Sequence, residues 1–136
     1  MAKPGKRRVL VVDDSVEILE ILLEILTEAG YQVETAQNGA SALLRVGDFR
    51  PDVVVLDLKL PSLSGFDVIR CLREDSAYRD LPVLLMSGVF LDEEMIRAQV
   101  GEPDIRLFLK PIDWTRFAAV IESAAADSER RKRHAA

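Results

Sequence analysis

Residues 53–61 read VVVLDLKLP, and this stretch decides the fold more than any other part of the chain. Its first four residues are all apolar, as in a β-strand that is buried on both faces of a parallel sheet. Three other runs share this character: VLVV at 9–12, VLLM at 83–86 and LFL at 107–109. The residues that directly follow these runs can handle phosphate or a metal ion; in chain order they are Asp13 with Asp14, Asp57, Ser87 and Lys110.

These apolar runs alternate with helical patterns along the chain. We expect strands at 8–12, 31–36, 53–56, 83–86 and 107–109, and helices at 14–30, 40–47, 66–74, 92–99 and from residue 114 onward. Strict alternation requires parallel strands with right-handed crossovers and helices on both faces. The predicted fold class is therefore α/β, a doubly wound, five-stranded parallel sheet with five alternating helices.

Local signals predict where several elements begin. Asp14, with Glu17 three residues later, predicts a capping box at the start of the first helix. The Asn38-Gly39 pair predicts a turn before the second helix, and Gly65 is expected to break the chain before the third helix.

Composition limits the classes of protein that fit. A chain of 136 residues, 49% of them hydrophobic, is long enough for one globular domain with a buried core. No apolar stretch reaches the length of a membrane span, and the start MAKPGKRR has no apolar segment behind it, so no signal peptide is expected. Cys71 is the single cysteine, which excludes an internal disulfide and favours a cytoplasmic setting.

Charge is unevenly distributed, which suggests the domain limits. Residues 9–128 carry 10 Lys/Arg against 22 Asp/Glu, a net of −12, whereas both ends of the chain are basic. We expect a basic N-terminal tail at 1–7, the functional domain at 8–126, and a basic tail or helix extension at 127–136. The acidic body argues against direct nucleic-acid binding, and the tails are expected to be mainly solubilising.

The residues that follow the apolar runs form a set suited to phosphoryl transfer. Carboxyl ends of parallel strands share one edge of the sheet, where ligands bind. Asp13, Asp14 and Asp57 would supply carboxylates for Mg²⁺, and Asp57 can itself act as a nucleophile that forms an acyl phosphate. Lys110 and Mg²⁺ would offset the repulsion between the carboxylates, and the Ser87 hydroxyl would bind a phosphoryl oxygen.

The segments VLVVDD, VVVLDLKLP followed by SGFD, VLLMSG and FLKP resemble the receiver domain of two-component response regulators over about residues 7–125. The resemblance implies a flavodoxin-like strand order of 2-1-3-4-5. It implies that Asp57 is the phospho-acceptor, that Asp13, Asp14 and the Lys59 backbone carbonyl hold Mg²⁺ with it, and that the Lys110–Pro111 bond is cis. Ser87 and Lys110 match the switch hydroxyl and the phosphate-pairing lysine.

The resemblance also implies partners and a mechanism. A histidine kinase or a histidine phosphotransfer protein presents a phosphohistidine, and Asp57 takes its phosphoryl group in the presence of Mg²⁺. Ser87 and Lys110 then close on the phosphate, which repacks the surface near the fourth helix and changes binding to a downstream protein.

The sequence departs from this family at two places. The family usually carries Tyr or Phe three residues before the lysine, where this chain has Leu107 and places its aromatic, Phe108, one position later. Either the switch works without an aromatic, or the expected strand register is wrong. Lys59 and Val89 stand where the hydrolytic water would pass, and Val89 cannot hold water, which argues against fast self-dephosphorylation.

Three functions remain in competition. The first is a stand-alone receiver that signals through protein binding, which Met1 and a short leader favour. The second is a receiver cut from a hybrid kinase or a multidomain regulator. The third is a phosphatase-like hydrolase, but such enzymes usually carry an aspartate two residues after the nucleophile, where this chain has Lys59. We therefore expect a signalling domain that acts only on its own phosphoryl group, not an enzyme.

Overall fold

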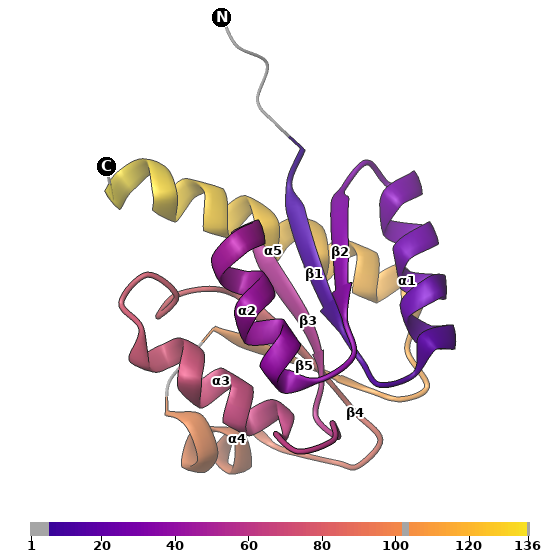
Figure 1. Cartoon of the computed structure of the whole chain (residues 1–136), viewed down its shortest axis with the longest axis vertical. Coiled ribbons are helices and arrows are strands. Elements are labelled where there is room, and N and C mark those ends of the chain that lie inside the picture. The colour runs from indigo at the N-terminus through magenta and orange to yellow at the C-terminus, as the bar shows by residue number, and fades with distance from the viewer. Residues whose placement is uncertain (1–5, 102–103, 136) are drawn as a thin grey trace, which may run out of the picture.

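Five parallel strands form a single sheet in the order β2-β1-β3-β4-β5 in the computed structural model, which describes residues 6–101 and 104–135, with side chains up to residue 128 (Figure 1). The strands are β1 (Arg8–Val12), β2 (Gln32–Ala36), β3 (Val53–Asp57), β4 (Val83–Ser87) and β5 (Ile105–Leu109). The helices are α1 (Val16–Glu28), α2 (Gly39–Phe49), α3 (Gly65–Glu74), α4 (Glu93–Val100) and α5 (Trp114–Ala135). The predicted α/β fold and its strand order are confirmed.

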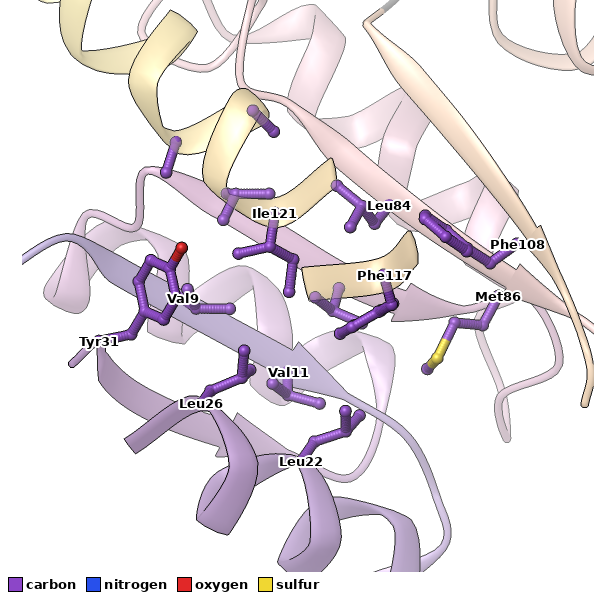
Figure 2. Close-up of a cluster of buried hydrophobic side chains, with 14 of the residues drawn as sticks. Val9, Val11, Leu22, Leu26, Tyr31, Leu84, Met86, Phe108, Phe117 and Ile121 are labelled. Carbon is purple, nitrogen blue, oxygen red and sulfur yellow. The ribbon is translucent and has the colours of Figure 1, made fainter. Parts of the chain in front are cut away.

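Helices cover both faces of the sheet, which explains why the strands are continuously apolar. Successive strand residues point to opposite faces, so Val53 and Val55 belong to one buried cluster and Val54 and Leu56 to the other. The first cluster packs the sheet against α1 and α5, and Figure 2 shows its side chains meeting between them. The second packs it against α2 and α3. No helix in the described part of the chain is both long and apolar enough to cross a membrane.

Ser15, not Asp14, is the N-cap of α1, so the predicted capping box was wrong. The Ser15 hydroxyl accepts a hydrogen bond from the Ile18 N–H at 3.3 Å, and the Ser15 N–H donates to Asp13 Oδ1 at 2.9 Å. Serine caps a helix about as well as aspartate does. The cap at Ser15 leaves the exposed Asp14 outside the helix, at the end of β1.

Two other helix starts also differ from their predictions. Asn38 is the N-cap of α2, where its side chain accepts the Ser41 N–H at 2.8 Å, instead of forming a turn with Gly39. Gly65 does not break the chain but is the first residue of α3, which follows a capping box between Ser64 and Asp67. In both cases the cap starts the helix one residue before the predicted boundary.

The last helix is bound to the domain by polar contacts on two sides. The Tyr31 hydroxyl donates to Glu122 at 2.5 Å, and the guanidinium of Arg7 pairs with the same carboxylate. From the other side, Arg106 on β5 pairs with Asp127 at 3.0 Å. These contacts fix α5 against the residues that lead into β1 and β2 on one side and against β5 on the other.

Tyr31→Phe is expected to lower the free energy of unfolding by about 1 kcal/mol at pH 7, because it removes one hydrogen bond to a mostly exposed carboxylate. The Tyr31 hydroxyl, followed by Arg7, lowers the pKa of Glu122 below its ordinary 4.5. The stability from this contact is therefore present above pH 4.5 and is lost as pH falls through the lowered pKa. Urea unfolding at pH 7 and at pH 3 should show the difference between variant and wild type shrinking in acid.

Candidate functional site

The carboxyl edge of the sheet gathers three carboxylates. Asp13 and Asp14 follow β1 and Asp57 ends β3, the neighbouring strand, and their ligand oxygens all lie within 4.8 Å of one another. Asp13 and Asp57 are buried, while Asp14 is exposed. The sequence predicted this meeting point from strand ends alone.

Asp13 carries a buried oxygen that lacks a protein partner. Its Oδ1 accepts the Ser15 N–H, whereas its Oδ2 is buried without a hydrogen bond among the residues that the structure describes. Burial raises the pKa of Asp13, and the nearby Asp57 and Asp14 raise it further, against the lowering effects of Ser15 and Lys110. A cation bound between these carboxylates would relieve both effects, so the donor set fits a hard divalent metal ion.

Asp57 is held from two directions at the end of β3. Lys110 places its ammonium 3.4 Å from Asp57 Oδ2, and the Lys59 N–H approaches Asp57 Oδ1 at 3.4 Å. The Asp57 side chain is only 7% exposed, compared with 38% for Lys110. The predicted pairing of lysine and aspartate is therefore present, and it leaves Lys110 open to solvent.

Ser87 ends β4 beside Asp57, but its hydroxyl is occupied. The Ser87 Oγ donates to the Val89 carbonyl at 2.8 Å and accepts the Val89 N–H at 3.1 Å. The Ser87 carbonyl accepts the Lys110 N–H at 2.8 Å, which joins two of the predicted site residues through the backbone. The Lys110–Pro111 peptide bond is cis, as the resemblance implied.

Comparison with known proteins matches this arrangement to one family. A family model described as the response regulator receiver domain covers residues 9–122. The chain belongs to this family. The receiver domains that define it are signalling domains, and the structure shows their five-stranded fold with the acidic residues at the expected edge.

Relatives of this receiver domain include short and long regulators. It is 31% identical to the polar-differentiation response regulator DivK of Brucella anthropi over 90% of this chain and 98% of that protein. It is 39% identical to the transcriptional regulatory protein KdpE of Mycobacterium tuberculosis, of which it spans 50%. The chemotaxis protein CheY4 of Vibrio cholerae matches structurally with a TM-score of 0.79 at 29% identity, covering 88% of this chain and 99% of that one.

The register of β5 in this receiver domain is as the sequence predicted. Leu107 lies opposite Leu85 and packs, half-buried, with the cluster on the α2 and α3 face. Phe108 points to the other face and meets Phe117 of α5 edge-on, with ring centroids 5.3 Å apart. Phe108 therefore does not take the place of Leu107, and the residue at the usual switch position is aliphatic. Leu107 lines an open hollow of about 360 Å³ between α4, β5 and α5.

Gly65 is a site residue that sequence reasoning missed. A Cβ at this position would lie 2.8 Å from the Asp57 carbonyl oxygen and 2.8 Å from Leu58 Cα. The start of α3 thus rests directly on the backbone that carries Asp57. A glycine between Ser64 and a helical pattern is the signal for this role in the sequence, but the same signal fits the predicted chain break, which the structure corrects.

Gly65→Ala is expected to reduce the free energy of unfolding by about 1–3 kcal/mol, the usual penalty for overpacking, and to slow phosphoryl uptake by shifting Asp57. Gly47→Ala is the matched control, because a Cβ there meets nothing within 4 Å and the position is inside α2. Alanine at position 47 should stabilise the domain by about 0.5–1 kcal/mol. Equal unfolding curves for Gly65→Ala and wild type would contradict the close approach.

Proposed function

We propose that this receiver domain accepts a phosphoryl group on Asp57 from the phosphohistidine of a histidine kinase or phosphotransfer protein. The observation that carries the proposal is the environment of Asp57, a buried carboxylate with an ammonium at 3.4 Å and two further carboxylates nearby. Such a cluster is unfavourable for folding unless a cation is bound. A cluster of this kind does not contribute to the stability of the fold, so we attribute its presence to phosphoryl chemistry.

Asp57 acts as the nucleophile in this proposal. An Asp57 carboxylate oxygen forms a bond to phosphorus while the bond from phosphorus to the histidine nitrogen breaks, and the imidazole leaves with that electron pair. Lys110 stays within reach of the carboxylate and pairs with the negative charge of the transferred group. Burial of Asp57 limits access of bulk water to the acyl phosphate.

The metal in the proposed site is Mg²⁺, held by Asp13, Asp14, Asp57 and the Lys59 backbone carbonyl. The unpartnered buried Oδ2 of Asp13 supports this assignment, because a metal ligand would satisfy it. Bound Mg²⁺ would neutralise charge on the phosphoryl oxygens.

The output of the domain is proposed to be a change in protein binding. Ser87 leaves the Val89 backbone to donate to a phosphoryl oxygen, and this exchange frees the segment that leads into α4. Leu91 of this segment lines the hollow between α4, β5 and α5, which offers a surface for a downstream protein. The chain matches 98% of DivK and 50% of KdpE, so a single-domain regulator and a receiver within a longer protein are both arrangements that its relatives show.

The direct test is phosphoryl uptake from a small donor. Incubation with acetyl phosphate and Mg²⁺ should add one phosphoryl group by intact mass, and peptide mapping after borohydride reduction should place it at Asp57. Omission of Mg²⁺ should suppress the uptake. Modification at another residue would contradict the assignment of Asp57 as the acceptor. Release of phosphate from an added ester with many turnovers would favour a hydrolase.

Asp13→Asn is expected to remove the stabilisation that Mg²⁺ gives to the wild type. At a Mg²⁺ concentration ten times the Kd, a ligand of the native state stabilises it by about 1.4 kcal/mol. The amide keeps an oxygen for the Ser15 N–H but removes a buried charge, so the metal-free variant should be at least as stable as the metal-free wild type. Thermal unfolding with and without Mg²⁺ checks this, with Glu20→Ala, an exposed α1 carboxylate, as the control that keeps the response.

A further inference from the structure

Ser62, in the loop between β3 and α3, has a backbone conformation that few residues adopt. Its φ is 69°, and in the described part of the chain only Arg50 shares a positive φ without being a glycine. Arg50 is the C-cap of α2, where a left-handed residue is common. At Ser62, in contrast, the Leu63 N–H donates to the Pro61 carbonyl at 2.8 Å. A hydrogen bond between residues two apart, around a residue with positive φ, defines the rare and strained form of the γ-turn.

The side chain of Ser62 does not account for this conformation. Asparagine and aspartate tolerate a positive φ better than other residues, because their side chains can form local hydrogen bonds. Ser62 is exposed, and its hydroxyl makes no hydrogen bond with any residue that the structure describes. The strain therefore costs stability without a compensating contact of the side chain, and its cause lies in the backbone around it.

The loop that contains Ser62 is fixed at both ends. The Leu58 carbonyl accepts the Gly65 N–H at 2.8 Å, so residues 59–64 leave the sheet and return to the same point. Leu63 lies close to the start of α2, since a Cβ on Gly39 would be 2.8 Å from the Leu63 Cβ. A strained turn persists only where the surrounding structure fixes the backbone in this way.

The same loop contains the backbone of Lys59, which lies beside the carboxylate cluster. The Lys59 N–H approaches Asp57 Oδ1 at 3.4 Å, and the buried Asp13 Oδ2 on the neighbouring strand end has no hydrogen-bond partner among the described residues. If this loop were mobile, a bound metal ion would have to order it, and the entropy lost on ordering would lower the affinity. A loop that is already ordered avoids this loss.

We propose that Ser62 is a positioning residue, whose strained turn holds the Lys59 carbonyl in place for Mg²⁺ before the metal binds. This inference rests on the proposed function, which assigns that carbonyl to the metal. The free energy of the strain is supplied during folding, so metal binding does not have to order residues 59–64. A relaxed turn should then stabilise the metal-free domain and at the same time weaken its affinity for Mg²⁺. A purely structural role for Ser62 would not produce these opposite effects.

Ser62→Gly is the direct test. Glycine adopts a positive φ without steric cost, and this relief exceeds the entropy that glycine adds to the unfolded chain, so the melting temperature of the metal-free variant should rise. The added freedom of the loop should lower the affinity for Mg²⁺ alone about two- to fivefold, as measured by isothermal titration calorimetry. The Leu63 amide hydrogen should exchange faster in the metal-free variant than in the wild type, and Mg²⁺ should slow this exchange.

Two further variants separate the relief of strain from the added freedom. Ser62→Asn also accepts a positive φ but leaves the backbone less free than glycine does, so it should raise the melting temperature and keep the wild-type affinity for Mg²⁺. Ser76→Gly makes the same substitution at an exposed turn residue that has no positive φ. It should lower the melting temperature and leave the affinity unchanged.

Unchanged Mg²⁺ affinity and unchanged Leu63 exchange in Ser62→Gly would overturn the inference and leave the proposed metal site intact. An equal fall in affinity in Ser76→Gly would also overturn it, because the effect would then not depend on this turn. If the wild type did not bind Mg²⁺ at all, the metal site of the proposed function would be wrong, and the inference with it.

Discussion

Asp57→Asn should take up no phosphoryl group from acetyl phosphate under conditions in which the wild type takes up one. The amide has nearly the shape of the carboxylate but lacks the anionic oxygen that attacks phosphorus. Its single oxygen can still accept a hydrogen bond from one of the two donors, Lys110 or the Lys59 N–H, which approach different carboxylate oxygens at 3.4 Å in the wild type. The loss would therefore reflect chemistry and not a collapsed site.

The folding of this variant gives a second check. Removal of one of three clustered carboxylates reduces their repulsion, so Asp57→Asn should be at least as stable as the wild type in the absence of metal. Asp48→Asn, an exposed aspartate on α2, is the control that should label normally. Uptake by Asp57→Asn at the wild-type level would show that the acceptor is elsewhere, in spite of the position of Asp57 at the end of β3.

The strands and their shared edge were predictable because burial on both faces leaves a simple sequence pattern. Runs such as VVVL are typical of strands that are buried on both faces of a parallel sheet, as these strands are. The residue after each run then lies at the carboxyl edge of the sheet. The side to which Leu107 points followed from the alternation of strand residues, and the structure agrees. Here a local pattern determined a tertiary arrangement.

The predictions of helix starts were wrong where neighbouring residues can play the same role. Asp14 and Ser15 are both good helix caps, and the sequence does not show that Asp13 Oδ1 binds the Ser15 N–H and selects Ser15. The role of Gly65 depends on the backbone of Leu58, which approaches it only in the folded chain. Likewise, the bond from the Ser87 hydroxyl to Val89 is a choice between partners that a sequence does not rank.

Ser87→Ala should separate phosphorylation from its structural response. The Ser87 hydroxyl bonds to the backbone of Val89 in this structure, and our proposal moves it to a phosphoryl oxygen. Alanine can make neither contact, so Asp57 should still take up phosphate while the segment before α4 no longer responds. Trp114, the only tryptophan, lies at the start of α5, shortly after the carboxyl end of β5, and contacts Phe117, so its fluorescence is a probe of changes near this edge of the sheet.

The expected result is a fluorescence change on addition of Mg²⁺ and beryllofluoride, a phosphoryl mimic, in the wild type and in Ser123→Ala, but none in Ser87→Ala. Ser87→Thr retains the hydroxyl and should restore the response. Leu107→Ala, which truncates a half-buried side chain, should reduce the free energy of unfolding by about 2 kcal/mol, the low end of the range for such truncations, yet keep the response. If Leu107→Ala lost the response while Ser87→Ala kept it, the switch would run through β5, and a leucine would do there what the proposal assigns to a hydroxyl.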